Sequence, residues 1–195
     1  MTRWAPQKTD VLDALGAEIL HNYPRGRVIV AVDGIAGTAE FADDLAEAVK
    51  NAGRAAFRAS MRDFREPRVL RYSAGSLPST DTYDIETLHR VLIDPFRDGG
   101  TGSFVLAAYD AERDAPVEPK WITAKPDALL IVDGASLQTA ELCGLWHYSI
   151  WLEASGEPDA GLATYLKQVK PRALATAIVD ASDPERPRRL FADSC

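Results

Sequence analysis

Apolar and polar positions alternate along the first third of the chain in a way that predicts a helix, a strand, a second helix and a second strand. Residues 7–22 carry apolar side chains at a helical spacing, and a proline and a glycine follow shortly afterwards. Residues 27–33 are nearly all apolar and largely β-branched, which is typical of a parallel strand covered on both faces. Residues 40–51 return to the helical spacing, and residues 54–60 predict a second short strand.

The same alternation continues through the rest of the chain. We expect a helix over residues 84–97, a buried strand over 129–134 that ends in an acid, a strand over 148–152, a helix over 159–170 and a strand over 173–180. Strands that alternate with helices imply a mostly parallel sheet with right-handed crossovers. The predicted fold class is therefore α/β, a three-layer α/β/α sandwich around a mostly parallel central sheet of about five strands.

The length of 195 residues fits one domain with a well-buried core, and no stretch has the composition of a linker. We therefore predict a single domain over residues 1–195, with an N-terminal helix within residues 1–25. Residues 62–83 are polar and rich in turn formers, and they predict a long loop. Two weak strands within residues 101–124 flank a stretch of acids and prolines, and together they predict a hairpin flap.

The charge balance and the cysteine count exclude several classes of partner. The net charge is −7, so no overall positive field attracts nucleic acid or an anionic membrane. The short basic cluster of Arg186, Arg188 and Arg189 predicts a solvated tail. The two cysteines and three histidines lack metal-ligand spacing. No apolar run has membrane-spanning length and no signal-peptide pattern is present, so we expect a cytoplasmic protein.

Residues 27–45 form a buried strand, a glycine turn and a helix start, which is the layout of a phosphate-binding loop. The pattern of such a loop is Gly, four residues, Gly, Lys, then Ser or Thr. Counting from Gly34 puts Ala39, Glu40 and Phe41 where Gly, Lys and Ser/Thr should stand. The required lysine is missing, and the acid in its place would repel a phosphate by about 1 kcal/mol.

Several short segments share the order and spacing of segments in one kinase family, although no single segment is specific. They are Val-Ile-Val-Ala-Val-Asp-Gly-Ile at 28–35, Phe-Ala-Asp-Asp-Leu at 41–45, Asp63-Phe64, Tyr83-Asp84, Leu-Ile-Val-Asp-Gly at 130–134, Ser-Ile-Trp-Leu at 149–152 and Val-Asp-Ala-Ser-Asp-Pro-Glu-Arg-Pro at 179–187. Together they resemble the uridine kinase-like branch of the P-loop nucleoside kinases, over most of the chain.

The resemblance implies a P-loop NTPase-like fold and ATP-dependent transfer of a phosphoryl group to a hydroxyl of a nucleoside or similar small molecule. Mg-ATP would be the cofactor of an active form. Such a reaction depends mostly on positioning and on charge neutralisation. The loop's N–H groups surround the phosphates, its lysine bridges the β and γ groups, and its Ser/Thr hydroxyl holds Mg²⁺. A carboxylate takes the acceptor's proton, and lid arginines cover the developing charge.

The nucleotide-binding residues that the resemblance implies are Gly34, Gly37 and Thr38, the remnants of the loop. The family pattern Gly-Ile-Asp-Gly-x-Gly-Lys-Thr-x-Phe-Ala-Asp stands here as Gly-Ile-Ala-Gly-Thr-Ala-Glu-Phe-Ala-Asp, so the loop before Phe41 is shorter. Asp133 corresponds to the acid that orders Mg²⁺ directly or through water. It has the alternative role of a strand-end carboxylate that caps a loop.

The catalytic and acceptor positions are also altered. The family's base is an aspartate at the position that Arg62 occupies here, so Asp63 is the remaining candidate base. Tyr83 and Asp84 correspond to acceptor-site residues, and helix capping by Asp84 is an equal alternative. The segment 153–162, where the family has an arginine-rich lid, contains no arginine.

Three hypotheses follow for the function. The chain is a kinase of weak activity in which Arg62 or Arg65 turns toward the phosphates, since arginine can hold a phosphate bidentately. Alternatively, it is a non-catalytic P-loop scaffold or a binding or regulatory module, natural or engineered. It is otherwise a shortened form of an ordinary kinase. A nucleotide or nucleoside is the expected small-molecule partner. A dinucleotide-binding fold is disfavoured because its Gly-x-Gly-x-x-Gly turn is absent.

Overall fold

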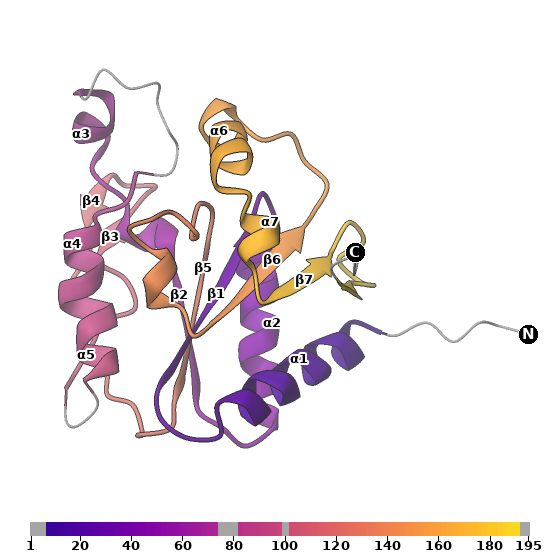
Figure 1. Cartoon of the computed structure of the whole chain (residues 1–195). Coiled ribbons are helices and arrows are strands. Elements are labelled where there is room, and N and C mark those ends of the chain that lie inside the picture. The colour runs from indigo at the N-terminus through magenta and orange to yellow at the C-terminus, as the bar shows by residue number, and fades with distance from the viewer. Residues whose placement is uncertain (1–6, 74–81, 99–101, 192–195) are drawn as a thin grey trace, which may run out of the picture.

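The computed structural model describes residues 7–73, 82–98 and 102–191, with the backbone alone for residues 71–73. Its centre is a six-stranded sheet in the order β2-β5-β1-β6-β7-β8, parallel except for β8 (Figure 1). The strands are β1 (Val28–Gly34), β2 (Ala56–Ser60), β5 (Leu129–Gly134), β6 (Tyr148–Glu153), β7 (Ala177–Asp180) and β8 (Arg188–Leu190).

Helices cover both faces of the sheet, so the three-layer α/β/α arrangement predicted from the sequence is confirmed (Figure 1). α1 and α2 pack on one face, and the continuous helix from α4 to α5, which includes a π turn at His89–Ile93, packs on the other. The helices are α1 (Lys8–Asn22), α2 (Thr38–Asn51), α3 (Arg68–Ser73), α4 (Ile85–Leu88), α5 (Asp94–Arg97), α6 (Ala160–Val169) and α7 (Pro171–Leu174).

The apolar run of β1 explains its central place in the sheet. Successive side chains of a strand point to opposite faces. Val28, Val30 and Val32 accordingly pack with α1 and α2, whereas Ile29 and Ala31 pack with the helix on the opposite face. All five side chains are buried. Because β1 is covered on both faces, it holds the turn that follows it in a fixed position.

Two boundaries differ from those predicted. The sheet gains β8 at its edge because the segment expected as a solvated tail turns back, and Leu190 pairs with Ile178 of β7. Arg189 then lies 3.4 Å from the carboxylate of Glu18 on α1. The last parallel strand begins at Ala177 and not at residue 173 as expected, because α7, which starts with Pro171 at its first turn, continues to Leu174.

Where a hairpin flap was expected, within residues 101–124, the described chain forms short antiparallel pairs. β3 (Tyr109–Asp110) pairs with β4 (Ala115–Pro116), and a further antiparallel bridge joins Phe104 to Ile122. Phe104 is fully buried against the α4–α5 face. The predicted loop over 62–83 contains α3, and its residues 74–81 lie outside the described part of the chain. In the described ranges no helix has the length and apolar character needed to cross a membrane.

Candidate functional site

The sheet topology places the site at the carboxyl ends of the central strands. β1 lies between β5 and β6, and the chain runs outward from β1 in both directions, which creates a topological switch point. Ligands of open α/β sheets bind outside the strand ends at such a point. A cavity of about 420 Å³ opens there, and its wall includes four of the predicted site residues, Gly34, Thr38, Tyr83 and Asp133. We call it the strand-end cavity.

The turn between β1 and α2 needs both of its glycines. A Cβ on Gly34 would lie 2.7 Å from the carbonyl oxygen of Leu152 on β6, so no side chain fits there. Gly37 has φ of 72°, in the left-handed region that glycine adopts without strain, and it begins α2. Thr38 and Ala39, the first residues of α2, line the cavity, so the positive end of the helix dipole lies at its wall.

Glu40, which stands where the loop lysine was expected, lies on the other side of this turn. Its Oε1 atom is 2.9 Å from Nζ of Lys8 on α1, and Lys8 also lies 2.6 Å from Oδ2 of Asp44. Hydrogen bonds to Asp44 and Glu40 raise the pKa of Lys8. The expected repulsion of a phosphate by Glu40 is therefore reduced, because a cation offsets its charge.

A second, largely apolar cleft lies across the turn from the strand-end cavity. Its volume is about 200 Å³, and Gly37, Phe41, Leu152, Ala154, Ala181 and Pro184 form much of its wall. Lys8 and Glu40 line its polar side. The β1–α2 turn thus separates an apolar cleft from a polar cavity.

Asp133 lies at the end of β5, as predicted, but it already has a cationic partner. Its side chain is 3% exposed, and Nη2 of Arg58 lies 2.6 Å from its Oδ1 atom. The hydroxyl of Ser60 donates a hydrogen bond of 3.2 Å to Oδ2. Burial raises the pKa of Asp133, and the nearby Arg58 and Ser60 oppose this shift. Both carboxylate oxygens are therefore engaged by the chain itself.

The donor set does not fit the Mg²⁺ that the resemblance implies. Within the described residues no three His, Cys, Asp or Glu side chains gather closely enough to hold a metal. Mg²⁺ requires oxygen ligands in near-ideal octahedral geometry. An ion at Asp133 would meet the guanidinium of Arg58 at that carboxylate.

Asp63, the predicted base, lies in a neighbouring cavity of about 530 Å³. Ser60 and Arg62 line both this cavity and the strand-end cavity, so the two adjoin. Asp63 is half-buried, and burial raises the pKa of its carboxyl group against the opposing charges of Arg58 and Arg62. A carboxylate with a raised pKa is better suited to accept a proton near neutral pH.

The two predicted acceptor residues have different surroundings. The hydroxyl of Tyr83 donates a hydrogen bond of 3.1 Å to the carbonyl oxygen of Ala135, and Tyr83 lines the strand-end cavity. Asp84 accepts a hydrogen bond of 2.8 Å from the backbone N–H of Thr87 and begins α4. Asp84 thus has the capping role that the sequence allowed as its alternative.

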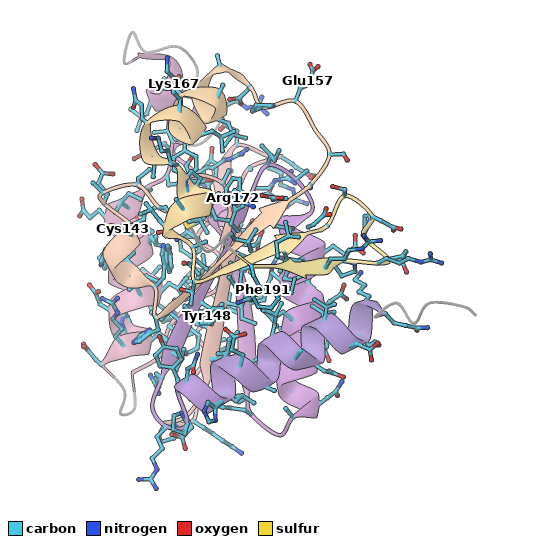
Figure 2. All side chains as sticks on the ribbon, turned by 45° about the vertical axis from the view of Figure 1, so that its right-hand side comes forward. Cys143, Tyr148, Glu157, Lys167, Arg172 and Phe191 are labelled. Atoms are coloured by element: carbon cyan, nitrogen blue, oxygen red, sulfur yellow. The ribbon has the colours of Figure 1, made fainter. Side chains whose placement is uncertain are left out.

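Arginines from the segment after β2 line the strand-end cavity, and acids from the segment between β6 and α6 line it as well. Arg62 and Arg65 line the cavity, and Arg62 pairs with Glu112 at 2.9 Å on the surface. Figure 2 shows Glu157 on the loop that leads from β6 to α6. Glu157 and Asp159 line the cavity from this loop, in the segment where the family has its lid arginines.

No pattern in the sequence pointed to Arg58, Ser60 or the buried pair of Asp33 and Tyr165. One feature of the sequence could have indicated Arg58: it is a cation within a short strand that leads into the site. Asp33 had another, because it is the only acid in an otherwise apolar strand.

The fold defines the class of protein: the chain has a P-loop kinase-like fold, as its resemblance to other solved structures shows. No family model and no curated protein matches the chain. A possible uridine kinase from Bacillus stearothermophilus matches with a TM-score of 0.73 and 20% identity, over 87% of this chain and 97% of that one. A candidate fructose transport system kinase from Silicibacter sp. TM1040 matches with a TM-score of 0.59 and 26% identity, over 85% of this chain and 84% of that one. These similarities confirm the predicted fold.

Proposed function

We propose that this chain binds a nucleotide across its β1–α2 turn and transfers the phosphoryl group slowly or not at all. One observation carries the proposal: the turn separates an apolar cleft from a polar cavity that arginines line. A nucleotide has the same two halves, a flat apolar base and a charged phosphate group. Ligand sites combine apolar walls with a few placed polar groups in this way.

The phosphates of the nucleotide would occupy the strand-end cavity. The N-terminus of α2 offers N–H groups that have no partner within the helix, together with the positive end of its dipole. Thr38 adds a hydroxyl to this wall, and Arg62 and Arg65 supply positive charge. The ion pair of Arg62 with Glu112 is exposed, and such pairs contribute about 0–1 kcal/mol, so a phosphate can replace the glutamate.

The base would lie in the apolar cleft. Phe41 and Leu152 are buried side chains that form its floor, and Ala154 and Pro184 line it from two separate loops. The neighbour described as a possible uridine kinase supports a nucleotide or nucleoside as the ligand class.

Slow or absent transfer follows from three charges that differ from the kinase pattern. Position 40 holds glutamate in place of the loop lysine, Asp133 is paired with Arg58, and residues 153–162 contain no arginine. Transfer depends on neutralising the charge of the moving phosphoryl group, and a single arginine can contribute roughly 10³–10⁵ in rate. A binding or regulatory module is therefore the role we favour.

A kinase of low activity is the second candidate, and the position of Asp63 favours it. This carboxylate lies in a cavity that adjoins the strand-end cavity at Ser60 and Arg62. An acceptor hydroxyl in that cavity would have a base beside it. The acceptor would be a nucleoside or a sugar, the substrate types in the two neighbours' names.

The proposal is tested by measuring ATP binding with calorimetry and thermal shift. The same measurements are made on a variant with leucine substituted in the apolar cleft. A nucleotide at one hundred times its dissociation constant adds about 2.7 kcal/mol to the stability of the folded state. Ala154→Leu should fill the cleft and weaken ATP binding at least tenfold, whereas Ala173→Leu, exposed on α7 away from both cavities, should leave it unchanged. ADP release that depends on an added nucleoside or sugar would favour the low-activity kinase. Absence of any ATP-induced shift at millimolar concentration would disprove nucleotide binding.

A further inference from the structure

The register of two neighbouring strands brings three polar side chains to one spot. β2 and β5 are parallel neighbours, and Ser60 lies directly beside Asp133. Arg58 precedes Ser60 by two residues, so its side chain points to the same face of the sheet. That face is the one covered by α2, whose Asp43 lies 3.7 Å from Nε of Arg58. The register of β2 and β5 therefore brings Arg58 and Asp133 into contact.

Burial makes the contact between Arg58 and Asp133 hard to exchange. The Asp133 side chain is 3% exposed and the Arg58 side chain is 26% exposed. An ionised carboxylate removed from water needs a partner, and loss of one member of such a pair strongly destabilises the fold. A divalent ion would have to displace the guanidinium and leave it without its main partner. Arg58 thus already supplies the positive charge that a metal would bring to Asp133.

We propose that Arg58 replaces a divalent metal as the counter-charge of Asp133, so that the strand-end cavity takes a phosphate-bearing ligand free of metal. The inference rests on the proposed function only in that the ligand carries phosphate. Arg62, Arg65 and the N-terminus of α2 then contact the ligand itself, while Arg58 holds the carboxylate that would otherwise repel it.

Inorganic pyrophosphate is the probe, and its binding is measured by calorimetry in EDTA and in excess Mg²⁺. Mg²⁺ complexes pyrophosphate in solution, so a site for the free anion binds less tightly in Mg²⁺ than in EDTA. A site that uses the metal shows the opposite order. We expect the protein to bind pyrophosphate in EDTA with an affinity equal to or higher than that in Mg²⁺.

Two variants test the role of each partner. Arg58→Met should reverse the preference, because Asp133 then lacks a counter-charge and accepts the metal. Asp133→Asn should tighten binding in EDTA by about fivefold, since one negative charge near the anion is removed. Arg172→Met is the matched control, because it breaks the pair of Arg172 on α7 (Figure 2) with Glu153 on β6, neither of which lines the cavity, and it should change neither affinity. Circular dichroism establishes that each variant is folded.

Three results would overturn the inference: tighter binding of pyrophosphate in Mg²⁺ than in EDTA by the unaltered protein, weaker binding by a folded Asp133→Asn variant, or no binding in either buffer. The comparison with the unaltered protein decides the matter even where a variant does not fold. Failure of the nucleotide proposal looks different, because ATP would then fail to bind while pyrophosphate still binds in EDTA.

Discussion

The hydroxyl of Tyr165 on α6 donates a hydrogen bond to the carboxylate of Asp33, which is 1% exposed near the end of β1. The same hydroxyl accepts a hydrogen bond of 3.0 Å from the backbone N–H of Gln138, in the loop after β5. One phenol thus joins α6, β1 and the loop after β5. Burial raises the pKa of Asp33 to about 7, although the hydrogen bond from Tyr165 opposes the shift.

Asp33 should make the protein less stable as the pH rises. The pKa of its carboxyl is 3.8 in an unfolded chain and about 7 in the fold, so the folded state binds the extra proton between these values. Stability is fully present below pH 4 and falls through pH 7, by roughly 2–4 kcal/mol from this group. Asp33→Asn cannot ionise, so the stability of the unaltered protein relative to this variant should be lower at pH 8 than at pH 5.

Urea unfolding of both proteins at the two pH values measures this difference. The comparison cancels the contributions of Asp63 and Asp133, whose pKa values are also raised. Equal pH dependence in the two proteins would show that Asp33 ionises normally in the fold.

Gly34→Ala should destabilise the protein. The added Cβ would lie 2.7 Å from the carbonyl oxygen of Leu152, and backbone on both β1 and β6 would have to move. Forced shifts of this kind typically cost about 1–3 kcal/mol. Gly144→Ala is the control, because a Cβ there meets nothing within 4 Å. The urea midpoint should fall for the first variant alone, and equal midpoints would contradict the close approach of the two strands.

Local patterns in the sequence were sufficient for most of the sheet. β1 and β5 are continuous apolar runs, and a run of this kind followed by a helical spacing has few other interpretations. β8 was missed because it is only three residues long, contains two arginines and exists through its pairing with β7. A short edge strand leaves no periodic signal.

The places of several candidate residues in the fold could be predicted from the sequence, but the contacts that their side chains make could not. Asp133 and Gly34 lie at the carboxyl ends of β5 and β1, as predicted. The carboxyl ends of parallel strands meet at one edge of the sheet. The pairing of Arg58 with Asp133 depends on β2 lying beside β5, and that order is a long-range property of the fold. The contact of Lys8 with Glu40 joins two helices in the same non-local way.

Lys8→Met should destabilise the protein by about 1 kcal/mol, because partly exposed ion pairs contribute up to about that amount each. The Lys8 side chain is 19% exposed and contacts both Glu40 and Asp44 on α2. Lys50→Met is the control, since Lys50 has one exposed partner, Glu47, within its own helix. The loss for Lys8→Met should shrink in 1 M salt, where charges are screened. A Lys8→Met midpoint equal to that of Lys50→Met would show that the pairs contribute nothing.

Restoring the phosphate-binding loop tests whether the rest of the site is competent. Residues 35–40 would be replaced by the longer Ile-Asp-Gly-Ser-Gly-Lys-Thr-Ser, which supplies the lysine and the enclosing glycines. ATP should then bind at least tenfold more tightly, because a charge-assisted contact to phosphate is added. The same loop with alanine for its lysine is the control and should give little gain. Calorimetry measures both affinities in EDTA, and a restored loop that is folded yet no tighter than its control would show that the strand-end cavity does not receive the nucleotide's phosphates.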